Sequence, residues 1–203
     1  DRRWDRTEKA YISLTDGIEK TAPNALAAIE QAYARNETDE FIDPTAIADE
    51  KGTILPRITN GDAVIFYNFR IDRPRQLTKA FILPRFEEEA HIMAFDPYAV
   101  KYYHKHTMDM DTRSKPFTRK IILKDLFFVT MTEYERNLPV SVAFPSERVS
   151  LPIGRVFSDM GLRQLRVSET EKERFIGYYL NGMREDPYPG EDRVIIPSPK
   201  IAT

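Results

Sequence analysis

The sequence predicts an α/β fold, because short apolar runs of strand length alternate with segments whose apolar residues recur at helical spacing. The first such run, 63–69, follows a turn signal at 60–62 and leads into Pro74, a residue tolerated in the first turn of a helix. A second apolar run covers 126–130. We therefore expect buried strands that deliver their carboxyl ends into helices.

Two helices and a loop are predicted before the first strand. An amphipathic helix begins near Trp4, and its apolar residues share one face. The residues of that face are Tyr11, Leu14 and Ile18. A second helix opens at Pro23 and closes near Asn36. The buried stripe expected for it consists of Leu26, Ile29 and Tyr33. The acidic segment 36–44 that follows is typical of a solvated loop.

A change of pattern near residue 139 predicts a domain boundary. Prolines at 139 and 145 restrict the backbone of 140–144, which is typical of a short connector. Compact strand and helix units follow it. They are a helix at 153–160 that stops at Gly161, a strand at 162–167, a helix from Thr170, and strands at 177–180 and 194–196. We therefore expect one domain over 1–138 and a second over 139–203.

The composition excludes several classes of protein. The chain has 30 Lys and Arg against 32 Asp and Glu, a formal net charge of −2, so no global field attracts nucleic acid or an anionic membrane. The absence of cysteine removes disulfides, thiolate catalysis and zinc–cysteine sites, and fits a reducing compartment, by default the cytoplasm. No apolar run approaches the roughly 20 residues that cross a bilayer.

A cluster of charged residues stands where the strand at 63–69 passes into the helix at Pro74. It consists of Arg70, Asp72, Arg73 and Arg75. Guanidinium groups are forked donors and a helix N-terminus offers backbone N–H groups, and both suit a phosphate or a carboxylate. The alternative is that these arginines pair with Asp72 and with acidic neighbours on a solvated edge.

Lys172 is a second candidate for contacting an anion. The segment 168–172 lies where a predicted strand ends and a helix begins, the usual place for ligand contacts in an open α/β sheet. The alternative for this single lysine is an ordinary surface charge.

Signals for metal binding and for covalent catalysis are weak. His104 and His106, with Asp109 and Asp111, carry metal-ligand atoms, but their spacing matches no characteristic ligand pattern, and a polar surface loop is the favoured interpretation. No serine lies in a Gly-x-Ser-x-Gly setting, and no glycine-rich phosphate loop is present. The residues therefore indicate anion recognition without a reaction centre, which favours a binding module.

Several motifs along the chain resemble those of one family, the cofactor-independent (2,3-bisphosphoglycerate-independent) phosphoglycerate mutases. They are 1–9 with its Arg-Trp-Asp-Arg core, 37–41, 61–75 with Asn-Phe-Arg-x-Asp-Arg, 131–134, 142–145, 162–172, 189–192 and 196–203. The resemblance covers most of the chain except roughly 86–124, a segment that looks longer than in typical bacterial members.

The resemblance implies an isomerase of glycolysis and gluconeogenesis that interconverts 3-phosphoglycerate and 2-phosphoglycerate through a phosphoserine. Such enzymes hold two metal ions, typically Mn²⁺, in a domain similar to alkaline phosphatase, and hold the glycerate in a domain inserted into it. They need no 2,3-bisphosphoglycerate. The residues that match their substrate-binding positions are Arg70, Arg73 and Lys172.

The resemblance also implies that the reaction centre lies elsewhere. The family's nucleophilic serine and its metal ligands correspond to positions before Asp1 and after Thr203, so no catalytic residue and no metal ligand is expected here. We expect 1–138 to be the latter part of the inserted substrate-binding α/β domain and 139–203 the start of the returning phosphatase-like α/β domain. This truncated chain would be inactive alone, would expose sheet edges, and would have the missing parts of the same polypeptide as partners. The rival hypothesis is a stand-alone anion-binding or regulatory module.

Overall fold

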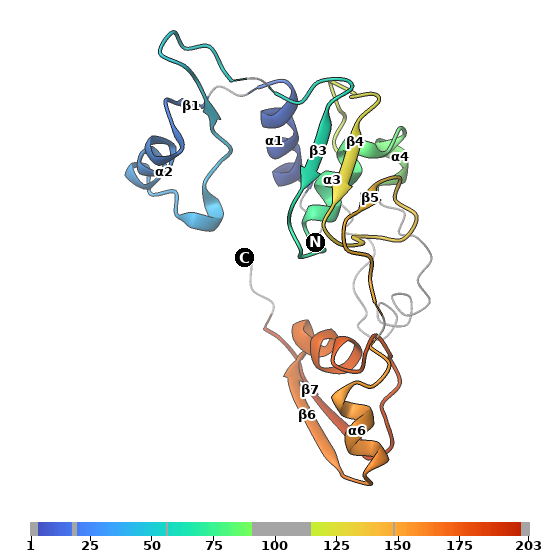
Figure 1. Ribbon diagram of the computed structural model, residues 1–203. Coiled ribbons are helices and arrows are strands. Elements are labelled where there is room, and N and C mark those ends of the chain that lie inside the picture. The colour runs from blue at the N-terminus through green and yellow to red at the C-terminus, as the bar shows by residue number, and fades with distance from the viewer. Residues whose placement is uncertain (1–3, 18–19, 56, 91–114, 148, 200–203) are drawn as a thin grey trace. The chain divides into compact units, whose positions relative to one another are not determined.

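The computed structural model describes residues 4–17, 20–55, 57–90, 115–147 and 149–199. It divides into two compact units, Asp1–Pro145 and Ser146–Thr203. Helices and strands are mixed in both units, and every pairing between named strands in the described ranges is parallel, so the predicted α/β class is confirmed (Figure 1). No helix within those ranges is both long and apolar enough to cross a bilayer.

The first unit contains a parallel sheet with the strand order β3-β4-β5 among the described residues. β3 (Ala63–Phe66) pairs along its whole length with β4 (Phe127–Thr130), which pairs in turn with β5 (Ser141–Val142). Gly61 precedes β3 in a turn with a positive φ of 83°, a conformation that suits glycine. The stretch predicted as a connector therefore contributes a strand, and this unit continues to Pro145.

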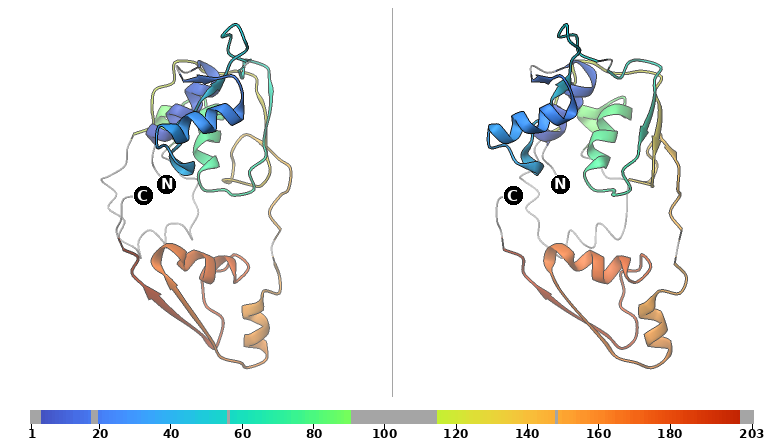
Figure 2. Two further views of the ribbon diagram at one scale, coloured as in Figure 1. Left: turned by 90° about the vertical axis from the view of Figure 1, so that its left-hand side faces the viewer. Right: turned by 60° about the vertical axis from the view of Figure 1, so that its left-hand side comes forward.

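Within the described ranges, helices cover one face of this sheet, and the other face carries exposed residues. α1 (Trp4–Thr15) and α3 (Pro74–Ile82) lie on the same side of β3 and β4 (Figures 1 and 2). Alternate residues of a strand point to opposite faces, so Ile65 is 64% exposed while its neighbours in β3 are partly covered. The predicted strand over 63–69 therefore forms over 63–66, and the prediction that it is buried is wrong. The start of α3 at Pro74 is confirmed.

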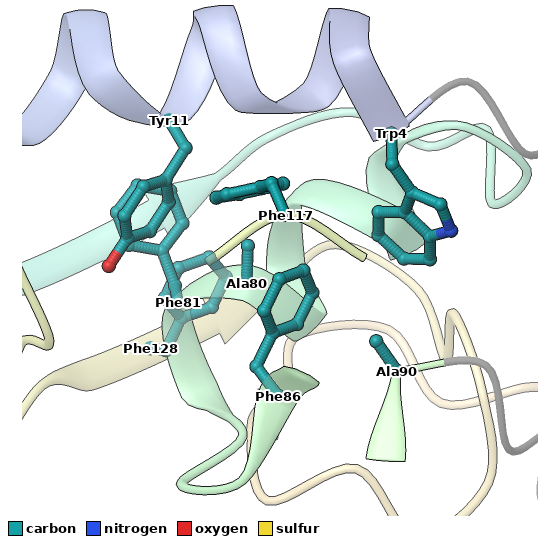
Figure 3. Packing of buried hydrophobic residues seen from close by; sticks show 8 residues of the cluster. All are labelled: Trp4, Tyr11, Ala80, Phe81, Phe86, Ala90, Phe117 and Phe128. Atoms are coloured by element: carbon teal, nitrogen blue, oxygen red, sulfur yellow. The ribbon is translucent and has the colours of Figure 1, made fainter. Parts of the chain in front are cut away.

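The core lies between the sheet and these helices, and it is rich in aromatic side chains (Figure 3). Its buried members are Trp4, Tyr11, Ala80, Phe81, Phe86, Ala90, Phe117 and Phe128. Tyr11 of α1 and Phe81 of α3 have ring centroids 4.9 Å apart, and Trp4 meets Phe86 of α4 (Phe86–Glu89) edge to face at 5.4 Å. The first contact joins α1 to α3, and the second joins α1 to α4. They fix the helix that follows the arginine cluster.

A smaller parallel pair, β1 (Thr21–Ala22) with β2 (Ala46–Ile47), flanks α2 (Ala25–Ala34) and the short 3-10 helix η1 (Asp39–Phe41). α2 begins two residues later than predicted, because the side chain of Asn24 caps it by accepting from the amide of Ala27. The predicted loop at 36–44 thus contains η1.

The buried stripe predicted for α2 is wrong. Leu26, Ile29 and Tyr33 are all exposed, and the buried residue of the helix is Ala32. α2 packs against β1, a strand of two residues, which is too small to cover a full apolar face. Apolar spacing identified the helix correctly, but burial depends on the neighbour that a helix meets.

The second unit has one parallel pair, β6 with β7, in register from Gln164 opposite Glu191 to Glu169 opposite Ile196. Its elements are α6 (Ile153–Asp159), β6 (Gln164–Glu169), the 3-10 helix η3 (Thr170–Lys172), the π-helix η4 (Phe175–Tyr179) and β7 (Glu191–Ile196). The predicted strand at 177–180 is wrong. Gly177 lies in η4, where an added Cβ would stand 2.9 Å from Nη1 of Arg193, so glycine allows the helix to approach this side chain.

The β6-β7 pair has an exposed, largely apolar face, which also carries Asp192, and an inner face with buried charged residues. Its exposed apolar residues are Leu165, Val167, Val194 and Ile196. On the other face the Glu191 side chain is 0% exposed, with its carboxylate 3.4 Å from Nη2 of Arg166 and 2.5 Å from Nε of Arg193. Burial alone would raise the pKa of Glu191, but hydrogen bonds from Asn181 and Arg193 outweigh burial and lower it. The interior of this unit therefore contains a buried ion network centred on Glu191.

Candidate anion-binding site

The two candidate arginines lie at the carboxyl edge of the sheet in the first unit. Residues 67–73, here called the arginine loop, connect the end of β3 to the start of α3 and contain Arg70 and Arg73. Because β3, β4 and β5 are parallel, the loops that leave them gather at the same edge. This is the edge at which open α/β sheets bind ligands.

Each arginine forms an exposed ion pair. Nη2 of Arg70 lies 2.9 Å from Oδ2 of Asp72, and the Arg70 side chain is 75% exposed. Nη1 of Arg73 donates to Oε1 of Glu40 at 3.1 Å, with both side chains more than half exposed. Asp72 was foreseen as a partner, whereas Glu40 was not identified from the sequence. Glu40 lies in η1, far from Arg73 along the chain, and no local pattern links the two.

These ion pairs are the contacts expected if the arginines only pair with acidic neighbours on a solvated edge. They are also compatible with binding of an anion. An exposed ion pair contributes only about 0–1 kcal/mol, so an incoming phosphate or carboxylate competes with a weak partner. Burial raises the pKa of Asp72, but the amide of Arg73 and the guanidinium of Arg70 outweigh burial and lower it. Asp72 is therefore an anion that orients Arg70.

Arg75 differs from the other two arginines. Its Nε lies 3.6 Å from Oε2 of Glu135. The same oxygen forms an ion pair with Nζ of Lys79 at 2.9 Å. The side chains of Lys79 and Glu135 are nearly buried. Arg75 therefore belongs to a partly buried charge cluster that attaches α3 to the segment after β4. The sequence placed it beside Arg70 and Arg73 without distinguishing this role.

The segment after β4 also holds the arginine loop by hydrogen bonds to its backbone. The hydroxyl of Tyr134 shares its hydrogen between the carbonyl oxygens of Phe66, at 3.1 Å, and Asn68. Oγ1 of Thr132 donates to the carbonyl of Phe69 at 3.0 Å. No role was predicted for Thr132 or Tyr134 from the sequence. Their position immediately after a strand is the signal that could have identified them.

Lys172, the third predicted site residue, lies in the second unit. It ends η3, directly after β6, and its exposed side chain holds Nζ 5.6 Å from the ring centroid of Phe175. Oγ1 of Thr170 donates to the carbonyl of Ile196 at 3.3 Å, which joins the carboxyl ends of β6 and β7. The structure thus places Lys172 at the carboxyl edge of its own sheet, as the sequence predicted.

The described part of the chain does not fit a metal centre. Within it, no group of three or more His, Asp or Glu side chains is arranged to hold an ion. His104 and His106, with Asp109 and Asp111, fall outside the described residues.

The chain is similar to one family along its whole length. The sequence model described as the BPG-independent PGAM N-terminus matches residues 1–136. Proteins named 2,3-bisphosphoglycerate-independent phosphoglycerate mutase are 47% identical in Chloroflexus aurantiacus and 44% identical in Thermomicrobium roseum, and each alignment covers 100% of this chain. It covers 36% and 34% of those proteins, so the chain spans about a third of the length of the curated relatives that it matches.

A solved structure shares the fold. It is a crystal structure of Leishmania mexicana phosphoglycerate mutase at low cobalt concentration. The alignment covers 99% of this chain and 32% of that one, with a TM-score of 0.54 and 23% sequence identity. This likeness supports the α/β architecture of the chain.

Proposed function

Because the chain belongs to the BPG-independent phosphoglycerate mutase family, we propose that it is part of an isomerase that interconverts 3-phosphoglycerate and 2-phosphoglycerate through a phosphoserine intermediate. The family's independence of 2,3-bisphosphoglycerate means that this compound is not needed as a cofactor. The observation that carries the proposal is the pair of exposed guanidinium groups, Arg70 and Arg73, at the carboxyl edge of a parallel sheet.

In this proposal Arg70 and Arg73 bind the oxygens of the substrate. A phosphate or carboxylate matches the fork of a guanidinium, and charged hydrogen bonds of this kind are stronger than neutral ones. The substrate anion would replace Glu40 at Arg73, while Asp72 keeps Arg70 oriented. Holding the substrate in one orientation is a contribution to catalysis that requires no reaction centre in this chain.

Lys172 would supply a compact positive charge to phosphoryl oxygens. The predicted bounds are 1–138 for the substrate-binding domain and 139–203 for the phosphatase-like domain. We assign the first compact unit to the former and the second to the latter, so Lys172 would act from the second domain. The ring of Phe175 beside Nζ is an apolar neighbour that favours a defined position for this long side chain.

The remaining parts of the reaction would belong to the rest of the same polypeptide. The nucleophilic serine and the ligands of two Mn²⁺ ions would lie there, and this chain alone would be inactive. The enzyme would serve glycolysis and gluconeogenesis in the cytoplasm, with phosphoglycerates as its ligands and neither nucleic acid nor a membrane as a partner.

The test is titration of 3-phosphoglycerate into the full-length protein and its variants. Arg70→Ala and Arg73→Ala should each weaken binding by roughly 1.5 to 3 kcal/mol, the value of a charged hydrogen bond. Arg85→Ala is the matched control, because it removes an exposed arginine of the first unit that pairs with Glu88 and Glu89. Unchanged binding in both loop variants would reject the arginine site. Binding without mutase activity in the wild-type protein would favour an anion-binding or regulatory module.

A further inference from the structure

We propose that Thr132 and Tyr134 are positioning residues, which hold the arginine loop in the conformation that binds phosphoglycerate. This inference rests on the proposed function. It concerns the backbone of residues 67–73, and the hydroxyl groups that hold it come from the segment that follows β4.

The hydrogen bonds begin where the strand pairing ends. The last paired residues of β3 and β4 are Phe66 and Thr130, so beyond them the backbone carbonyls of the loop have no ladder partner. Backbone carbonyls outside a ladder need another hydrogen-bond donor, from a side chain or from water. The hydroxyl groups of Tyr134 and Thr132 supply it, to the carbonyls of Phe66 and Asn68 and to that of Phe69.

The contact with Phe69 acts directly on Arg70. The carbonyl of Phe69 and the amide of Arg70 belong to the same planar peptide unit, so a hydrogen bond to that carbonyl restricts the orientation of the whole unit. The direction in which the Arg70 side chain leaves the backbone is restricted with it. Oγ1 of Thr130 donates to the carbonyl of Thr132 at 2.9 Å, and this holds Thr132 itself.

The side chain of Tyr134 is buried and held in place by packing. It is 2% exposed, and its ring meets the ring of Phe66 edge to face, with centroids 5.9 Å apart. A buried, well-packed side chain has few alternative rotamers, so its hydroxyl stays where the loop carbonyls need it. The arginine side chains are long and exposed, and the precision of the site therefore depends on the backbone that carries them.

Two matched pairs of variants test the inference in the full-length protein. Thr132→Val removes the hydroxyl and keeps the shape, and Thr132→Ser keeps the hydroxyl. Tyr134→Phe removes the other hydroxyl, and Tyr11→Phe is its control, because Tyr11 is also buried and donates to the carbonyl of Ile121 at 2.8 Å, within the core. Binding of 3-phosphoglycerate and thermal unfolding are measured for each variant, together with KM and kcat.

We expect Thr132→Val and Tyr134→Phe to raise the Kd and the KM for 3-phosphoglycerate roughly three- to tenfold, the value of one hydrogen bond, with a smaller change in kcat. Thr132→Ser should restore the wild-type Kd. Tyr11→Phe should lower the melting temperature without changing the Kd. If Tyr134→Phe fails to fold, Thr132→Val, at a half-buried position, still decides the question.

Two outcomes overturn the inference without rejecting the proposed function. In one, the wild-type protein binds 3-phosphoglycerate and Thr132→Val binds it equally well, which rejects the positioning role and leaves the proposed function intact. In the other, Tyr11→Phe weakens binding as much as Tyr134→Phe, so that the effect follows lost stability and not the loop. A wild-type protein that does not bind 3-phosphoglycerate would reject the proposed function itself, and the positioning role with it.

Discussion

Arg73 donates to Glu40 at 3.1 Å across a separation of 33 residues, so the arginine loop holds at Arg73 a carboxylate that comes from outside the loop. The carboxylate of Glu40 has the same chemistry as one end of phosphoglycerate. In our account it occupies the position at Arg73 that the substrate takes over. This relationship gives the first prediction.

Glu40→Gln should strengthen binding of 3-phosphoglycerate to the full-length protein. The variant removes a competing negative charge whose exposed ion pair is worth about 0–1 kcal/mol, so the expected gain is at most about fivefold in Kd. Titration calorimetry at low salt measures it. Glu88→Gln, which removes an exposed carboxylate paired with Arg85, should leave the Kd unchanged. Weaker binding in Glu40→Gln would show that Glu40 supports the arginine and does not compete for it.

The stability of the first unit should fall in acid because of two carboxylates near α2. The guanidinium of Arg35 and the ammonium of Lys20 lower the pKa of Glu37 to about 2, and Lys9 and Lys20 lower the pKa of Asp43 to about 2. Both values lie below the ordinary 4.5 and 3.8. A depressed folded-state pKa stabilises the fold fully above the ordinary value, and this stabilisation is lost as the pH falls toward 2.

Urea denaturation of the wild-type chain and of Glu37→Gln between pH 6 and pH 2 measures this effect. The wild type should be the more stable at pH 6, and the difference should shrink as the pH falls. A difference that grows in acid would contradict the sign that we assign to the pKa shift.

Glu191 should be essential to the second unit, whereas its neighbour Asp192 should not. Glu191→Gln leaves the buried guanidinium groups of Arg166 and Arg193 without their anion, and removal of one partner of a buried pair costs about 3 kcal/mol or more. Asp192→Asn breaks only an exposed pair with Arg163, worth less than about 1 kcal/mol. Urea titration of both variants measures the two free energies of unfolding. If the two variants lost equal free energy of unfolding, burial of the ion pairs would not determine how much they stabilise the unit.

The features that could be predicted from the sequence are local ones. The strand at β3, the helix start at Pro74 and the arginines between them follow from neighbouring residues, and they have the predicted order in the structure. The contacts that shape the site are not local. Arg73 meets Glu40 across 33 residues and Tyr134 meets Phe66 across 68, and without a second sequence for comparison no spacing rule reports such pairs.

Two wrong predictions have a similar cause. The stripe of α2 was assigned to the interior from its spacing, but β1 does not cover it. The run at 177–180 has the aromatic composition of a strand, but it lies partly in the π-helix η4, where Gly177 packs against Arg193. In both cases the burial or the conformation of the segment depends on the element that packs against it, and the local sequence does not identify that element.

The most direct test of the central claim is a mutase assay of the full-length protein without added 2,3-bisphosphoglycerate, comparing the wild type with the double variant Arg70→Ala, Arg73→Ala. We predict that the wild type converts 3-phosphoglycerate to 2-phosphoglycerate and that the double variant loses at least about a hundredfold in kcat/KM, since two charged hydrogen-bonding groups are removed. A double variant as active as the wild type would contradict the assignment of these arginines to the substrate, and an inactive wild type would contradict the proposed reaction.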